Sequence, residues 1–232
     1  MKNFKSRLKS EIIIKTPQVN TKKFKLLDLF SCGGMGAEGY IRSGFDCIGV
    51  DKDYHKNYPS QMHVCDVFDF LQSYKLNYDA IHASPPCQGY SKLKHFSKQN
   101  TGLHIEEIRE LLIETNKPYV IENVPGSTLK NYIKLNGTMF GHKYVKERWF
   151  ESNVFLMAPP KIPIKGKCFI PSYGVGPTGY ISLIGNNFNK AKALYELGTS
   201  RNYNIKEISE GIPPVYTEFI GHQLIQSLRS SQ

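Results

Sequence analysis

Cysteine is scarce in this sequence, and the few cysteines are not arranged as ligand pairs. The 232 residues include five, at positions 32, 47, 65, 87 and 168, and no two of them form a Cys-X-X-Cys pair. An odd number without such a pair argues against a disulfide framework and against a zinc site built from neighbouring cysteines. We therefore expect a protein of a reducing compartment that has no metal centre.

Long apolar runs are also absent. No stretch approaches the roughly 20 consecutive apolar residues that a membrane-spanning helix needs. The lysine-rich amino-terminal segment has no apolar core of the kind found in secretory signals. The hydrophobic fraction of 40% and the mean hydropathy of −0.38 are ordinary for a globular protein. We expect a chain that is neither secreted nor bound to a membrane.

Acidic residues are nearly missing from the first part of the chain. Residues 1–25 contain eight lysines and arginines but one acid, and the whole chain has a net charge of +10. This segment has no apolar periodicity, so we expect residues 1–24 to form a flexible basic arm. A solvated tail or a localisation signal explains such an arm as well as phosphate binding does.

Short apolar runs alternate with helical patterns in the first half of the chain, which is typical of a parallel α/β sheet. After about residue 150 the chain becomes rich in proline and glycine, and we expect a small irregular or β-rich insert over 151–186. Strands are expected at 25–30, 47–50, 62–65, 78–83 and 118–122, and helices at 37–42, 67–73, 105–115, 187–198 and 215–230. These elements predict one main domain over 25–150, to which the segment 187–232 returns.

Two polar motifs follow apolar runs and are expected to meet at one edge of the sheet. Residues 84–89 read SPPCQG, and residues 122–126 read ENVPG. Ligands bind beyond the carboxyl ends of the strands in open α/β sheets. Cys87, held between prolines and glycine, is a candidate nucleophile, and Glu122 is a candidate acid–base partner. Lysines at positions 92, 94 and 98 follow Cys87, and such cations suit a polyanionic substrate.

A glycine-rich turn follows the first expected strand. Residues 28–36 read DLFSCGGMG, which differs from the GxGxxG spacing of dinucleotide sites, and the chain has no GK[ST] motif for nucleotide phosphates. Glycines at 33, 34 and 36 let the backbone approach a ligand closely. Asp51, at the end of the second expected strand, suits a ribose diol. The alternative is a tight connection with no ligand.

In their order and spacing, these motifs resemble those of the C5-cytosine DNA methyltransferases, over about residues 25–228. Arg148 lies in a short arginine motif, and residues 211–218, GIPPVYTE, resemble the closing motif of compact, phage-like members. The resemblance implies a doubly wound, Rossmann-like sheet that binds S-adenosylmethionine, with the insert at 151–186 recognising the target. It further implies a monomer that methylates double-stranded DNA, as in restriction–modification, and that resides where DNA does in a bacterial, phage or viral host cell.

The resemblance also implies roles for particular residues. The Cys87 thiolate would add to C6 of a flipped-out cytosine and so activate C5, because C5 alone is a weak nucleophile. Glu122 would bind N3 and the exocyclic amine, and Arg148 would hold O2. S-adenosylmethionine would be converted to S-adenosylhomocysteine without a metal. The expected cofactor-binding residues are Phe30, Ser31, Gly33, Gly34, Met35, Gly36, Asp51, Lys52, Asp66, Val67 and Pro85, and the expected DNA-binding residues are Gln88, Ser91, Lys92, Lys94 and Lys146.

The chain departs from the family pattern at two places. Lys146 stands where an arginine is usual, and Ser209-Glu210 replaces a Gly-Asn pair, so neither of the latter two is assigned a cofactor role. Two alternatives stay open: a tRNA cytosine methyltransferase of the same superfamily, and a DNA-binding protein that keeps the fold without catalysis. Residues 168–170 read CFI, which is close to the Cys-Phe-Thr signature of the RNA enzymes. Cofactor binding and methyl transfer would separate the catalytic from the non-catalytic alternative.

Overall fold

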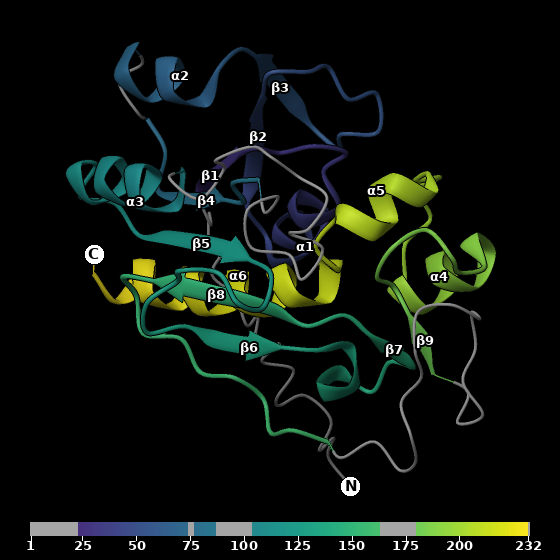
Figure 1. Ribbon diagram of the computed structural model, residues 1–232. Helices are drawn as coiled ribbons and strands as arrows, with labels where there is room; N and C mark the ends of the chain where they lie inside the picture. Colours follow the sequence, from purple (N-terminus) through teal and green to yellow (C-terminus); the bar gives the residue numbers. More distant parts are fainter. Residues whose placement is uncertain (1–22, 74–76, 87–103, 163–179, 232) are drawn as a thin grey trace, which may run out of the picture.

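A seven-stranded sheet forms the centre of the protein (Figure 1), in the order β3-β2-β1-β4-β5-β8-β6. The computed structural model describes residues 23–73, 77–86, 104–162 and 180–231. The first five strands of this order pair in parallel, whereas β8 runs antiparallel to both β5 and β6. The strands are β1 (Lys25–Leu29), β2 (Asp46–Asp51), β3 (Gln61–Val64), β4 (Ala80–Ala83), β5 (Tyr119–Asn123), β6 (Ile133–Leu135) and β8 (Arg148–Ser152).

Helices cover both faces of the sheet, and each face has its own apolar cluster. One cluster joins α1 and α6 to Leu26, Val120 and Phe150, and the other joins α2 and α3 to Leu27 and Ile121. Leu26 and Leu27 are neighbours in β1 that point to opposite faces, as strand geometry requires. The helices are α1 (Met35–Ser43), α2 (Val67–Ser73), α3 (His104–Glu114), α4 (Lys190–Leu197), α5 (Ile205–Glu210) and α6 (Pro214–Ser230).

The central strands form because most of their residues are apolar on both sides. Every residue of β4 and β5 is buried, as is every residue of β1 after Lys25. Strands covered on both faces are continuous apolar runs of this kind rather than alternating patterns. The strands and helices expected before residue 125 are therefore confirmed within one or two residues at most ends.

Helix α6 packs against α1 at very short range. A Cβ atom on Gly39 would lie 2.0 Å from the Pro214 carbonyl oxygen and 2.1 Å from Thr217 Oγ1. The Thr217 hydroxyl donates to the Gly36 carbonyl oxygen at 2.7 Å. Glycine at position 39 is what lets the two helices approach, so α6 holds α1 against the sheet.

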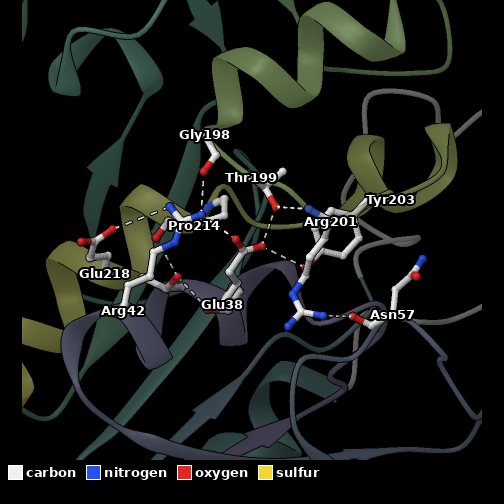
Figure 2. A network of polar contacts seen from close by, with 11 residues as sticks. Glu38, Arg42, Asn57, Gly198, Thr199, Arg201, Tyr203, Pro214 and Glu218 are labelled. Atoms are coloured by element: carbon white, nitrogen blue, oxygen red, sulfur yellow. Dashed lines mark hydrogen bonds and ion pairs between the residues drawn. The ribbon is translucent and has the colours of Figure 1, made fainter.

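A network of polar contacts attaches the segment after α4 to α1 (Figure 2). Glu38 Oε2 accepts hydrogen bonds from Thr199 Oγ1 at 2.8 Å and from the Tyr203 hydroxyl at 3.1 Å. Arg42 Nη2 lies 2.5 Å from Glu38 Oε1 and also donates to the Gly198 carbonyl oxygen at 2.7 Å. The helix that begins at the glycine-rich turn is therefore tied to residues more than 150 positions away.

The second half of the chain differs in detail from what the sequence predicts. Strand β8 continues the main sheet to Ser152, and a small parallel pair joins β7 (Tyr144–Val145) to β9 (Ile181–Ser182). A 3₁₀ helix at Gly137–Phe140, η2, and helix α5 were not expected, whereas α4 and α6 confirm the expected helices. Residues 163–179 of the expected insert, and nearly all of the basic arm, lie outside the described residues. Within the described part, no helix combines the length and apolarity needed to cross a membrane.

Candidate active site

The candidate site lies at the point in the sheet where the order of the strands changes direction, between β1 and β4. From β1 the chain proceeds to β2 and β3 on one side, whereas β4 and β5 lie on the other side of β1. A crevice outside the carboxyl ends of the strands forms at such a switch point, and ligands bind there. The polar motifs of the sequence follow β1, β2, β4 and β5, so the topology brings them to one edge.

The glycine-rich turn after β1 has an unusual backbone. Phe30 and Cys32 have positive φ angles of 58° and 43°, and Gly34 has a φ of 78°. A Cβ atom on Gly34 would also lie 2.3 Å from Pro59 Cδ and 2.6 Å from the Tyr58 ring. Gly34 is therefore required by its conformation and by packing from the β2–β3 connection, a reason that the sequence did not reveal.

Asp51 fixes this turn from the end of β2. Its Oδ2 accepts the Cys32 backbone N–H at 2.8 Å, and its Oδ1 accepts the Asp53 N–H at 3.1 Å. His55 Nε2 lies 3.5 Å from the same Oδ1. The Asp51 side chain therefore joins the turn after β1 to the turn after β2, so it is central to any ligand site here.

Asp66 and Phe30 lie at the neighbouring strand ends. Asp66 is exposed, and its Oδ1 accepts the N–H groups of Phe68 at 2.8 Å and Asp69 at 3.3 Å, which caps the start of α2. The Phe30 ring meets the Phe68 ring edge-on, with 6.3 Å between centroids. A carboxylate and an aromatic pair therefore lie where a purine could be held.

The other expected cofactor residues differ in exposure. Lys52 is exposed and Gly36 is half-buried, whereas Ser31, Gly33, Met35, Val67 and Pro85 are buried. The Pro85 carbonyl oxygen accepts a hydrogen bond from Asn123 Nδ2 at 2.9 Å, which ties the end of β4 to the end of β5. Within the described residues, Ser31 Oγ is buried without a hydrogen-bond partner.

Glu122 and Arg148 form a buried ion pair at the carboxyl end of β5. Arg148 Nε lies 2.9 Å from Glu122 Oε1, and each side chain is only 8% exposed. Burial raises the pKa of Glu122 to about 7, although the charges of Arg148 and Lys146 act in the opposite direction. No well-aligned hydrogen bond reaches Glu122 Oε1 from the described residues. The carboxyl group is therefore poised to change protonation near neutral pH.

Lys146 is placed differently from what we expected, and the expectation that it contacts DNA is wrong. Its side chain is fully buried. The ammonium donates to the carbonyl oxygens of Ile208 and Ser209, both at 2.6 Å, and to that of Leu183 at 3.3 Å. A cation is favoured at the carboxyl end of a helix, and here it satisfies carbonyls at the end of α5. Lys146 therefore attaches α5 and the segment after β9 to the strand that carries Arg148.

Helix α5 is a part of the site that the sequence analysis missed. Both carboxylate oxygens of Glu207 accept hydrogen bonds from Asn57 Nδ2, at 2.9 and 3.1 Å, and Glu207 also forms a reciprocal capping box with Asn204. A Cβ atom on Gly33 would lie 2.9 Å from the Glu207 carboxylate. The Asn-X-X-Glu spacing of 204–207 was the available signal for this helix. The short distance between Gly33 and Glu207 shows that α5 packs directly on the glycine-rich turn.

A buried polar layer lies beneath the turn. The Tyr58 hydroxyl donates to Asp28 Oδ2 at 3.2 Å, and the Tyr40 hydroxyl lies 3.0 Å from His82 Nδ1. Burial raises the pKa of Asp28 to about 8 and lowers the pKa of His82 to about 3. Both groups are therefore neutral over much of the physiological range, and their strands carry no charge into the core.

Several expected site residues lie outside the described residues. These are the candidate nucleophile Cys87 and the expected DNA contacts Gln88, Ser91, Lys92 and Lys94. The described segment that contains β4 ends at Pro86, three residues after the end of the strand. Strand β4, which precedes Cys87 in the sequence, is adjacent to β5, which carries Glu122 near its carboxyl end.

Comparison with known proteins agrees with this architecture. Residues 24–137 match the family described as C-5 cytosine-specific DNA methylase. The Type II methyltransferase M.FnuDI of Fusobacterium nucleatum is 31% identical over 116 residues, which cover 46% of this chain and 34% of that protein. The matched part therefore spans about a third of the length of this curated relative.

Solved structures share the fold at low sequence identity. A prophage-encoded E. coli protein, described as a DNA modification methyltransferase, has a TM-score of 0.66 at 14% identity, covering 89% of this chain and all of that one. Spodoptera frugiperda DNMT2 has a TM-score of 0.58 at 14% identity, covering 88% of this chain and 100% of that one. These similarities show a Rossmann-like α/β fold, and the family match over residues 24–137 covers just under half of the chain.

Proposed function

We propose that the protein is a DNA (cytosine-5)-methyltransferase that uses S-adenosylmethionine. The observation that carries this proposal is the buried Glu122–Arg148 pair at the end of β5, one strand away from the end of β4. A carboxyl group with a pKa near 7 beside a fixed guanidinium is suited to a neutral heterocycle that gains charge during reaction. The family match supports the same assignment.

The Glu122–Arg148 pair would recognise the Watson–Crick edge of an unpaired cytosine. Protonated Glu122 can donate to N3 while its other oxygen accepts from the exocyclic amine. Arg148 carries donors that suit the O2 atom. Loss of the Glu122 proton would remove the donor to N3, so the pKa of this group sets the upper limit of the active pH range.

Cys87 would supply the nucleophile. Its thiolate would form a bond to C6, and the electron density displaced by that bond would make C5 nucleophilic. Removal of the C5 proton after methylation would expel the thiolate and restore the ring. The target base must leave the duplex for this chemistry, at a cost of a few kcal/mol.

The cofactor would bind along the turns after β1, β2 and β3. Asp51 would hold the ribose diol, with Phe30 and Asp66 at the adenine. S-adenosylmethionine would supply an electrophilic methyl group. The buried, unpartnered Ser31 Oγ fits this assignment, because a bound ligand would satisfy a polar atom that is costly to leave unpaired. Gly33, Gly34, Met35, Gly36, Lys52, Val67 and Pro85 would complete the site around these residues.

Double-stranded DNA is the proposed substrate, bound by a monomer. The net charge of +10 and the lysines after Cys87 support a polyanionic partner. Gln88, Ser91, Lys92 and Lys94 would contact the DNA around the gap left by the flipped base, and residues 151–186 would contribute to recognition of the target. In this interpretation Lys146 acts on the protein rather than on the DNA.

Expression in a host without cytosine methylation, followed by bisulfite sequencing of its DNA, tests the proposal. We expect 5-methylcytosine at a short recurrent motif, and its loss in Cys87→Ala and in Glu122→Ala. Purified protein is assayed in parallel for transfer of labelled methyl groups to duplex DNA and to tRNA. Labelling of tRNA alone would overturn the DNA assignment, and cofactor binding without any transfer would overturn catalysis.

A further inference from the structure

Three side chains that can bind a metal come together beside the glycine-rich turn. Cys32 lies on the turn after β1, and Asp51 and His55 lie at and after the end of β2. The Cys32 Sγ, an Asp51 carboxylate oxygen and a His55 ring nitrogen all lie within 4.8 Å of one another. The ligands come from separate turns, so the absence of a Cys-X-X-Cys pair does not exclude this site.

The geometry is close to what a tetrahedral metal ion requires. Metal–ligand distances of about 2.0–2.3 Å place neighbouring zinc ligands roughly 3.3–3.7 Å apart. His55 Nε2 is already 3.5 Å from Asp51 Oδ1. Asp51 Oδ2 holds the Cys32 backbone N–H at 2.8 Å, which keeps the thiol beside the same carboxylate. The Cys32 Sγ lies within 4.8 Å of the other two ligand atoms and would have to move closer to them to complete a three-ligand set.

Two of the three ligands are also accessible, because only Asp51 among them is buried. Cys32 is exposed in the described structure, so an ion can reach the thiol from solvent.

We propose that Cys32, Asp51 and His55 bind a thiophilic divalent cation of the zinc class, and that this cation and the cofactor exclude one another. A sulfur, a nitrogen and an oxygen ligand with one open position suit zinc or cobalt rather than magnesium or calcium. On binding, the Cys32 thiol releases its proton to solvent and its sulfur bonds to the metal, with no change of oxidation state. Only the exclusion of the cofactor rests on the proposed function, because that function assigns Asp51 to the ribose.

Cobalt(II) titration of the purified, reduced protein tests the site directly. We expect a thiolate-to-cobalt absorption band in the near ultraviolet that saturates at one equivalent and is displaced by zinc. The band should be lost in Cys32→Ser and weakened at least tenfold in affinity in His55→Gln. Cys65→Ser is the control, because it removes a half-exposed thiol outside the cluster and should leave the band unchanged. The titration is repeated in Cys87→Ala, so that the proposed nucleophile is not mistaken for the ligand.

A band that persists in Cys32→Ser, or that disappears only in Cys87→Ala, would overturn the metal site. Competition is then measured by adding S-adenosylmethionine to the cobalt-loaded protein, without any methyl-transfer assay. Loss of the band as the cofactor binds is the expected result. A band that depends on Cys32 but is unaffected by saturating cofactor would keep the metal site and overturn the exclusion, and would also contradict the role proposed for Asp51.

Discussion

Replacement of Lys146 by methionine tests the structural role of the buried ammonium. Methionine has a similar length and is apolar, so the change removes the charge while it keeps most of the volume. Two short bonds of 2.6 Å to carbonyls at the end of α5 are lost. Hydrogen bonds to charged groups contribute about 1.5–3 kcal/mol each, but the variant no longer buries a charge, so we expect a net loss of about 2–4 kcal/mol in unfolding free energy.

For a domain of this size, that loss corresponds to a decrease of about 4–16 °C in melting temperature. Thermal and urea unfolding followed by circular dichroism would measure it, and Lys143→Met is the matched control because Lys143 is exposed and lies in the same segment. The loosened α5 should also weaken cofactor binding, since Glu207 on this helix packs on the glycine-rich turn. A melting temperature within 2 °C of the control would refute the conclusion that the ammonium holds α5 in place.

Three further predictions follow from buried groups. Because the folded-state pKa of Glu122 is raised from 4.5 to about 7, the native state loses stability as pH rises between these values. The melting temperature of Glu122→Gln should therefore rise relative to that of the parent protein as pH increases from 5 to 8. A difference between the two melting temperatures that does not change with pH would contradict the raised pKa. Arg109 Nε lies 2.6 Å from Oε1 of buried Glu151, so Arg109→Met should lower the unfolding free energy measured with urea by about 3–5 kcal/mol. The double variant with Glu151→Gln should recover part of this loss, and additive losses would argue against coupling of the two residues. Gly39→Ala forces a methyl group onto the backbone of α6 and should cost about 1–3 kcal/mol or more; a variant with the parental melting temperature would show that the helices can separate at no cost.

The sheet could be predicted where burial is complete. Strands β1, β4 and β5 are apolar along nearly their whole length, and a short apolar run followed by a polar turn identifies such strands without further information. Strand β8 could not be recognised in the same way, because Arg148 and Glu151 are polar residues whose burial depends on partners elsewhere in the chain. Its antiparallel direction depends on the return path of the chain, which no local pattern specifies.

The candidate site was predicted in part for a similar reason. Acids at strand ends, such as Asp51, follow directly from the alternation of strands and helices. The position of Lys146 could not be predicted, because the carbonyl groups that hold it belong to residues 37, 62 and 63 positions further along the chain. A basic residue in a DNA-binding protein is expected to face the phosphates, and only the fold shows that this one caps a helix.

The contact between α1 and α6 has a consequence for how the protein can be made. The helix that starts at the glycine-rich turn is covered by residues 214–230, so its apolar side stays uncovered while the ribosome is still producing the second half. The parallel sheet likewise depends on pairings between distant segments, which form slowly. A nascent chain that stops before Pro214 would expose the apolar side of α1 to chaperones and proteases. The apolar side of α1 can therefore be covered only after residues 214–230 have been synthesised.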